Sequence, residues 1–302
     1  MSDLLETIRE LQYQKIRSKR RIRRIIILLV FLLLLGGAAA LYYVSVQQNK
    51  NFEITEYTVN TDKIDGSVKI AVLSDLHNSE FGENNRNLIQ AIENVNPDFI
   101  LMCGDMVIQT DPDIGVVLNL CQELIKTADI YYLLGNHEGV LEYDEDGLQI
   151  PLDAYLYKIG VKVCYTGEYV IATDAGDIRL FSASMTQESY RADDNVQTEM
   201  DTFLKKEGYK IIADHYPTLL YDELYDADYD LGIAGHFHGG QIIIPGIGGL
   251  FHKDTGFFPK YYGGLYDLGE AKLVVTRGLG NSSLIPRINN PPELTVININ
   301  GV

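Results

Sequence analysis

The sequence VKIAVLSDLH, residues 68–77, decides the fold. Its first part, VKIAVL, is mostly apolar and rich in β-branched residues, as expected of a strand buried on both faces. Polar residues follow at once, with Ser74, Asp75 and His77. In an open α/β sheet, ligands bind beyond the carboxyl ends of the strands, so these side chains are candidates for a functional site.

The same pattern recurs twice further along the chain. Residues 98–105 read DFILMCGD, and residues 130–138 read IYYLLGNHE. Asp75 and Asp105 are 30 residues apart, and Asp105 and Asn136 are 31 residues apart. Both intervals contain apolar residues at helical spacing, over residues 84–95 and 114–126. Strands and helices that alternate in this way predict βαβ units and a parallel sheet.

The remainder of the chain continues as an α/β protein. We expect strands at 162–165, 169–173, 178–182, 209–213 and 228–234, and helices at 152–159 and 197–206. Residues 184–196 are polar and are expected to form a mobile loop. Strands at 272–276 and 293–298 are expected to close a second sheet. Residues 45–302 are numerous enough for one large domain or two small ones.

The N-terminal region is of another kind. Residues 25–44 read IIILLVFLLLLGGAAALYYV, without a charge, and a helix of about 20 apolar residues spans a bilayer. A basic cluster precedes it, namely Lys15, Arg17, Lys19, Arg20, Arg21, Arg23 and Arg24. That cluster predicts a single-pass protein of the cell membrane with a cytoplasmic N-terminus and an extracytoplasmic body. The alternative is a cleaved signal peptide, since Ala38-Ala39-Ala40 resembles a cleavage site.

These features predict four parts: a basic cytoplasmic segment at 1–24, a transmembrane helix at 25–44, a stalk with an initial strand at 45–65 and a globular domain at 66–302. Residues 45–302 hold 17 basic and 39 acidic residues. So acidic a body argues against nucleic-acid binding, which depends on Lys and Arg at phosphates. The three cysteines, Cys103, Cys121 and Cys164, are expected to be buried apolar residues.

Five groups of polar residues follow predicted strands: Asp75-Leu-His77, Gly104-Asp105, Gly135-Asn-His-Glu138, Asp214-His215 and Gly235-His-Phe-His238. Five of the six histidines lie in these groups, and we expect them to converge on one rim. Their nitrogen and oxygen ligands suit Mn, Fe or Zn. If Asp75-x-His77 and His236-x-His238 are extended, each pair of side chains points to one side and can bind one metal. The sixth, His252, is expected to be an ordinary loop residue.

This ordered set of motifs resembles the calcineurin-like metallophosphoesterase family. The sequence Gly235-His-Phe-His-Gly-Gly-Gln241 and the tail from Arg277 to Glu293 are similar to a bacterial branch of it. That branch holds membrane-anchored or secreted phosphodiesterases, and pyrophosphate-cleaving enzymes that act on lipid-linked sugar nucleotides. The resemblance covers about residues 66–300 and makes residues 66–302 the catalytic domain. It implies a four-layer αββα sandwich around two mixed β-sheets, preceded by the transmembrane helix.

The resemblance also implies two divalent metal ions. The first would be bound by Asp75, His77, Asp105 and His238; Asp105 would bridge to the second, which Asn136, His215 and His236 complete. His137 would be a catalytic residue beside the pair, without binding metal. Asp214 would either orient the ring of His215 or be a solvated acid at a strand end.

Two metal ions about 3.5–4 Å apart can clamp a phosphoryl group and activate water. We therefore expect a membrane-anchored phosphoesterase in which a hydroxide held between the metals attacks a phosphodiester in line, the substrate being a lipid-linked or cell-envelope component. The alternatives are a pyrophosphatase for a lipid-linked sugar nucleotide and a non-catalytic membrane-tethered interaction module. Arg277 and Arg287 either grip substrate phosphate or form structural ion pairs. Tyr261 and Tyr262 are weaker candidates for a loop near the site.

Overall fold

The computed structural model describes residues 2–111, 113–141, 150–281, 283 and 285–302. The chain forms two compact units, Met1–Gln47 and Gln48–Val302. The first unit is part of one helix, α1 (Ser2–Gln48), which is continuous through the basic cluster and the apolar run. Over Glu6–Gln48 this helix is long and apolar enough to cross a membrane.

The second unit is built on two six-stranded sheets. The first has the order β1 (Glu53–Thr61), β16 (Glu293–Gly301), β2 (Ser67–Leu73), β3 (Phe99–Cys103), β4 (Asp129–Leu133) and β5 (Lys162–Cys164). The second has the order β14 (Gly264–Leu268), β15 (Ala271–Val275), β9 (Leu231–Ala234), β8 (Tyr209–Asp214), β7 (Gly176–Ser182) and β6 (Gly167–Thr173). Both sheets are mixed: β2 to β5 are parallel, as are β7, β8, β9 and β15, whereas β16–β2, β14–β15 and β6–β7 are antiparallel.

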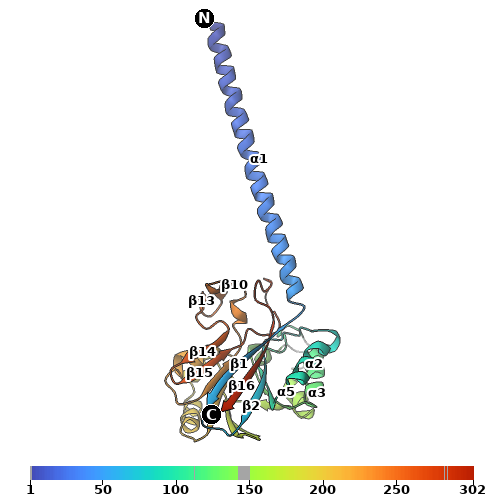
Figure 1. Ribbon diagram of the computed structural model, residues 1–302, viewed down its shortest axis with the longest axis vertical. Helices are drawn as coiled ribbons and strands as arrows, with labels where there is room; N and C mark the ends of the chain where they lie inside the picture. Colours follow the sequence, from blue (N-terminus) through green and yellow to red (C-terminus); the bar gives the residue numbers. More distant parts are fainter. Residues whose placement is uncertain (1, 112, 142–149, 282, 284) are drawn as a thin grey trace. The chain divides into compact units, whose positions relative to one another are not determined.

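Alternation along each strand creates the layers. Ile70 and Val72 of β2 belong to a core between the two sheets, whereas Ala71 and Leu73 belong to a core under the helices. Helices α2 (Arg86–Val95), α3 (Gly115–Leu124) and α5 (Leu152–Lys158) cover the first sheet (Figure 1). Helix α7 (Asp194–Leu204) and the helical turn η2 (Leu219–Glu223) cover the second. This arrangement is the expected four-layer αββα sandwich, and each buried aliphatic side chain stabilises it by about 1.5–3 kcal/mol.

Two expectations need correction. β16 was expected in the second sheet, but it lies in the first, between β1 and β2. Residues 184–196 were expected to be a mobile loop, yet they contain helix α6 (Gln187–Arg191) and the start of α7. The polar side chains of Thr186 and Asp193 cap these helices by accepting backbone N–H groups, which is why the segment is polar. Within the expected stalk, residues 53–61 form β1 and pair with β16.

The segment after β9 makes short elements only. They are η3 (His238–Gly240), the pair β10 (Ile243–Ile244) and β11 (Gly248–Gly249), and the pair β12 (Phe251–His252) and β13 (Gly256–Phe257). Two short helical segments, η1 (Glu83–Asn85) and α4 (Asn136–Gly139), complete the described elements. All three cysteines are buried and free, as expected.

Candidate metal centre

The site is assembled at the carboxyl ends of neighbouring strands. Asp75 follows β2 and Asp105 follows β3, each by two residues. Asn136 is the first residue of α4, close after β4. In the second sheet, His215 follows β8 directly and His236 follows β9 by two residues. The two sheets therefore deliver the five predicted groups to one edge, as the sequence indicated.

The backbone at these residues is not extended. Asp75, Asp105 and His236 have φ angles of 54°, 54° and 70°. His77 and His238 have φ angles of 46° and 47°. The expectation that extended Asp-x-His and His-x-His segments align their side chains was therefore wrong, and left-handed turns aim them instead. Such conformations cost a non-glycine residue about 1–3 kcal/mol each and gather at functional sites.

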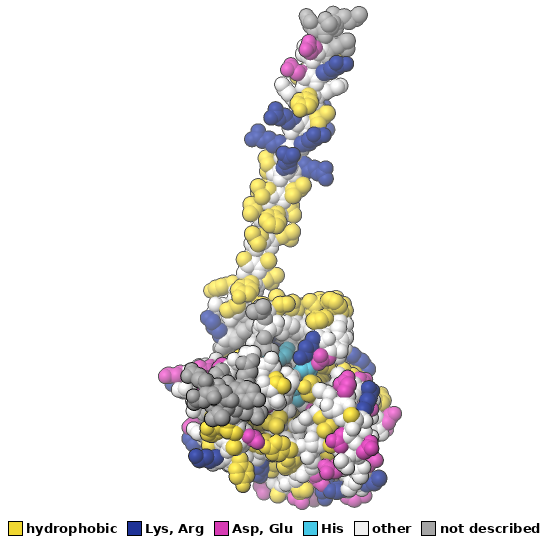
Figure 2. Space-filling view, turned by 180° about the vertical axis from the view of Figure 1, so that it is seen from behind, with side chains coloured by type: hydrophobic (Ala, Val, Ile, Leu, Met, Phe, Trp, Pro, Cys, Tyr) yellow, Lys and Arg dark blue, Asp and Glu magenta, His cyan; other side chains and the backbone are white. Residues whose placement is uncertain are grey.

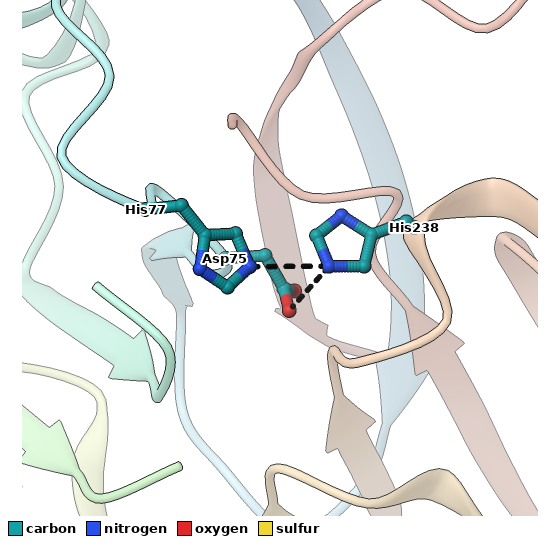
Figure 3. Close-up of side chains that lie close together, drawn as sticks. All are labelled: Asp75, His77 and His238. Atoms are coloured by element: carbon teal, nitrogen blue, oxygen red, sulfur yellow. Dashed lines mark hydrogen bonds and ion pairs between the residues drawn. The ribbon is translucent and has the colours of Figure 1, made fainter. Parts of the chain in front are cut away.

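The first cluster joins Asp75, His77 and His238, whose ligand atoms lie within 4.8 Å of one another. Nε2 of His238 is 3.2 Å from Nε2 of His77 and 3.4 Å from Oδ1 of Asp75 (Figure 3). Figure 3 shows Asp75 and His77, which lie on one segment, converging with His238 from a separate segment. One carboxylate and two imidazoles at this spacing suit a divalent transition metal.

The second cluster joins Asp105, His215 and His236. Nε2 of His215 is 3.2 Å from Oδ2 of Asp105 and 3.0 Å from Nδ1 of His236. Asp105 also forms a group with His77 and His137, so it lies between the two clusters. The buried Oδ1 atom of Asn136 has no hydrogen-bond partner among the described residues, and a buried amide oxygen in that state suits a metal ligand.

Hydrogen bonds on the outer side of three rings fix their tautomers. Nδ1 of His215 donates to the carbonyl of Cys103 at 2.8 Å, and Nδ1 of His77 donates to that of Val107 at 3.3 Å. Nε2 of His236 is 2.7 Å from the carboxylate of Asp254 and donates to it. The other nitrogen of His77 and that of His236 then present a lone pair to the cluster, and Nε2 of His215 does so once that ring has lost its second proton. Metal ligands are oriented in this way in proteins.

Burial and nearby charge shape the electrostatics of the site. Burial lowers the pKa of His77 to about 3 and that of His236 to about 4, so both rings are neutral at pH 7. Burial also opposes charge on His215, but Asp105 beside it raises its pKa to about 10. Burial raises the pKa of Asp75 to about 6. Positive charge is therefore stabilised between these carboxylates, and the residues present fit two divalent metal ions.

Glu138 holds the loops that carry Asp105 and Asn136. Its Oε2 accepts the backbone N–H groups of Asp105 and Gly135, both at 2.9 Å, and its Oε1 accepts the hydroxyl of Tyr132 at 2.7 Å. A Cβ at Gly135 would lie 2.3 Å from Oδ1 of Asp105, so only glycine fits there. The sequence analysis identified the group Gly135-Asn-His-Glu138, but residue type alone did not reveal that Glu138 holds these loops.

His137 faces the same cavity but is held differently. Its Nδ1 accepts the backbone N–H of Gln109 at 3.0 Å, so a neutral ring carries its proton on Nε2. That Nε2 is 3.8 Å from Oδ2 of Asp105. A neutral His137 ring thus offers a proton donor rather than a lone pair at Nε2.

The clusters open into a cavity of about 310 Å³. Site residues Asp105, Asn136, His137, His236 and His238 line one part of it; Phe237, Gly240, Gln241, Ile242, Leu250, Phe251, His252, Lys253, Ser283 and Ile285 line the remainder. His252 was expected to be an ordinary loop residue, but its ring packs against that of His236 at 4.8 Å between centroids. The spacing His252-x-Asp254 was the one signal in the sequence that could have indicated this neighbourhood.

The two arginine candidates serve the protein's own structure. Arg277 pairs with Glu293 at 2.9 Å and with Glu53 at 3.4 Å, so it forms the structural ion pair. Arg287 is buried; its Nε donates to the carbonyl of Gly280, and a terminal nitrogen lies 3.0 Å from Nδ1 of His238. A guanidinium only donates, so Arg287 donates to Nδ1 of His238 from behind, and a neutral His238 ring holds its proton on Nε2. Metal binding at Nε2 of His238 would therefore displace that proton.

Three further candidates, Asp214, Tyr261 and Tyr262, also take other places. Asp214 is fully buried and accepts the backbone N–H of Met185, so it is neither solvated nor bonded to the ring of His215. Burial raises the pKa of Asp214 to about 8. Tyr261 stacks on Tyr221 in the core under the second sheet. Tyr262 is not among the residues that line the cavity.

A two-sheet αββα sandwich with adjacent His, Asp and Asn clusters at its strand ends defines the class of metal-dependent phosphoesterases. Residues 68–240 match the family model described as calcineurin-like phosphoesterase. The match covers more than half of the chain, and the chain belongs to this family, as its motifs predicted.

Relatives agree with this assignment. An uncharacterised metallophosphoesterase of Campylobacter jejuni is 28% identical over 261 residues, which cover 83% of this chain and 64% of that protein. The phosphodiesterase YaeI of Escherichia coli is 27% identical over 237 residues, covering 76% of this chain and 82% of that protein. The chain thus matches less than two thirds of the length of the Campylobacter relative. A dimetal phosphatase structure from Danio rerio has a TM-score of 0.42 at 13% identity, covering 71% of this chain and 88% of that one.

Proposed function

We propose that this protein is a membrane-anchored, binuclear metal-dependent phosphoesterase that hydrolyses phosphodiester bonds. The observation that carries the proposal is the position of Asp105, whose carboxylate lies between the two clusters of candidate metal ligands. The preference for diesters is supported by similarity to a relative named as a phosphodiesterase. A non-catalytic module would have no need for two complete sets of ligands.

Each proposed metal has a full set of ligands. Asp75, His77, Asp105 and His238 would hold the first, and Asp105, Asn136, His215 and His236 would hold the second. Nitrogen and oxygen ligands without sulfur favour Mn, Fe or Zn. When bound, such a pair acts as a Lewis acid on the phosphoryl oxygens and makes water nucleophilic near neutral pH.

The chain's own residues would position and protonate the substrate. The Nε2–H of His137 can donate to a phosphoryl oxygen or to the leaving oxygen, because Gln109 holds the other ring nitrogen. Glu138 keeps Asp105 in place through the backbone of its loop. A positioned acid of this kind contributes about 10²–10⁴-fold to the rate.

The membrane part of the proposal rests on α1. Its apolar segment is long enough to cross a bilayer, and the basic cluster before it favours a cytoplasmic N-terminus. The catalytic unit would then be extracytoplasmic. A phosphodiester of a membrane lipid or of the cell envelope is the substrate that best fits this location.

The test uses the full-length chain in detergent, stripped of metal and then supplied with Mn²⁺. Hydrolysis of bis-p-nitrophenyl phosphate is measured beside that of p-nitrophenyl phosphate. We expect metal-dependent hydrolysis with preference for the diester, and its loss in the Asp105→Ala and His236→Ala variants. The Asp267→Ala variant is the matched control, because this exposed acid lies on the edge strand β14, does not line the cavity and pairs with Lys272 at the surface.

If the protein binds two metals per chain but cleaves neither compound with Mn, Fe or Zn, the proposed hydrolysis of soluble phosphodiesters is wrong. Equal activity in the Asp105→Ala variant would contradict the assigned site. Preference for the monoester would make the protein a phosphatase.

A further inference from the structure

Large apolar side chains are exposed around the mouth of the cavity. They are Ile247 (65% exposed), Phe251 (44%), Phe257 (70%), Phe258 (53%) and Ile285 (54%), and we call them the apolar rim. Figure 2 shows hydrophobic side chains gathered along the edge of the catalytic unit that also shows the histidines. Figure 1 places β10 and β13, which carry or adjoin these residues, at one edge of that unit.

The three phenylalanines of the rim form a connected surface. The rings of Phe251 and Phe257 are 5.1 Å apart between centroids, and those of Phe257 and Phe258 are 6.2 Å apart. The strands beneath them are two residues long each, so the rim does not cover a core of its own. A contiguous exposed apolar patch of this kind marks an interaction site.

The rim is continuous with the metal centre. Phe251 and Ile285 belong both to the rim and to the wall of the cavity. Between β12 and β13, Asp254 turns inward and accepts the hydrogen bond from His236. Whatever contacts the rim therefore lies at the mouth of the catalytic cavity.

The charges near the rim favour a lipid surface as its partner. In a body with 39 acidic and 17 basic residues, the segment 241–262 holds Lys253, Lys260 and a single acid, Asp254, which is engaged with His236. Exposed aromatic side chains flanked by lysines are typical of surfaces that enter the interface of an anionic membrane. Residues 49–52 are all that connect the end of α1 to β1, so an anchored helix keeps the catalytic unit at the membrane.

We propose that the apolar rim docks on the lipid surface and presents head-group phosphoesters to the cavity. The second half of this inference rests on the proposed function, whereas the docking itself does not. The hydrocarbon part of the lipid would contact Phe257 and Ile247, and the phosphoester would reach the site past Phe251.

The chain contains no tryptophan, so one introduced indole reports on its own surroundings. The full-length Phe257→Trp variant is reconstituted in phosphatidylcholine–phosphatidylglycerol vesicles, with and without brominated acyl chains. We expect blue-shifted emission that the brominated lipid quenches. The Tyr157→Trp variant is the control, because Tyr157 is 79% exposed on α5, outside the rim, and its emission should stay water-like and unquenched.

Identical spectra from the two variants would overturn the docking. A blue shift that depends on protein concentration and is not quenched would assign the rim to a second copy of the chain, which also overturns it.

Activity supplies the second arm of the test. Full-length protein with Phe257→Ser and Ile247→Ser is compared with the parent on a phosphodiester lipid in vesicles and on soluble bis-p-nitrophenyl phosphate. Neither residue lines the cavity, so we expect hydrolysis of the lipid to fall roughly tenfold and that of the soluble diester to be retained. Unchanged hydrolysis of the lipid would overturn the presentation of head groups. A parent that cleaves no soluble diester would contradict the proposed function, while the indole emission would still decide the docking.

Discussion

The carboxylate of Asp254 lies 2.7 Å from Nε2 of His236, a ring whose other nitrogen faces the metal centre. Asp254 belongs to a surface hairpin, whereas His236 is buried. The negative charge of Asp254 fixes the tautomer of His236 and raises its basicity as a ligand. A partly exposed loop thus helps to set the affinity of a buried site.

Replacement of Asp254 should therefore weaken metal binding. We expect Asp254→Asn to lower the affinity for the second metal about 10–100-fold, because the charge that supports His236 is lost. Isothermal titration of metal-free protein with Mn²⁺ measures this change. Asp267→Asn makes the same substitution at an exposed carboxylate and should leave the affinity unchanged. Equal affinities in all three proteins would show that Asp254 is a surface contact only.

Glu138 should matter for stability even without metal. The carboxylate of Glu138 accepts hydrogen bonds from the backbone N–H groups of Asp105 and Gly135. In Glu138→Gln an amide N–H₂ replaces an accepting oxygen, so buried N–H donors lose their acceptor. We expect unfolding in the presence of a chelator to require about 1–3 kcal/mol less free energy. Urea titration followed by circular dichroism measures it. Glu123→Gln, on the surface of α3, is the matched control and should change little. A native-like midpoint for Glu138→Gln would contradict its bracing role.

The central part of the fold could be predicted because its signals are local. Each of the three strands that end near Asp75, Asp105 and Asn136 is an apolar run followed directly by polar residues, and the intervals fit one helix each. Such a pattern depends on neighbours in sequence, so composition and spacing reveal it. The family resemblance then supplied the order of the layers.

The rest depended on long-range contacts. β16 pairs with β1 and β2, more than 200 residues away, and no local pattern assigns it to one sheet or the other. The polar segment before α7 supplied helix caps, which residue type alone does not separate from a loop. His252 and Asp254 reach the site through a hairpin whose strands have two residues each, too short for a detectable periodicity. The left-handed turns at Asp75 and His236 could not be predicted, because a positive φ at a residue other than glycine is uncommon and residue type does not indicate it.

Loss of the His137 ring should separate catalysis from metal binding. Its Nδ1 accepts the Gln109 N–H, and in the proposed mechanism the ring supplies a proton and binds no metal. We expect His137→Ala to retain two metals per chain by elemental analysis and to lower turnover of the diester about 10²–10⁴-fold. Asp105→Ala, which should lose both properties, provides the contrast. Loss of metal from His137→Ala would instead make His137 a ligand or a support of one.

Arg277 should act on stability and leave substrate affinity alone. Its guanidinium faces the buried carboxylate of Glu293, so Arg277→Met leaves that charge without its partner. We expect a loss of about 3–5 kcal/mol in the free energy of unfolding. Lys272→Met breaks an exposed pair with Asp267 and should cost less than about 1 kcal/mol. If Arg277→Met instead raised the KM for a small diester while the folded state kept its stability, Arg277 would be a substrate contact.

Metal should stabilise the folded chain, because the inward-facing nitrogens of His77, His215 and His236 and the carboxylate of Asp105 are brought together only in that state. A ligand at 100 times its Kd adds about 2.7 kcal/mol, which for a unit of this size corresponds to a rise of about 5–10 °C in Tm. Differential scanning calorimetry of chelated and Mn²⁺-supplied protein measures the rise. His215→Ala removes one proposed ligand of the second metal, so this variant should show only part of the rise in Tm. An equal rise in His215→Ala would mean that the ion binds elsewhere on the acidic surface, and no rise in the parent would mean that these clusters hold no metal at all.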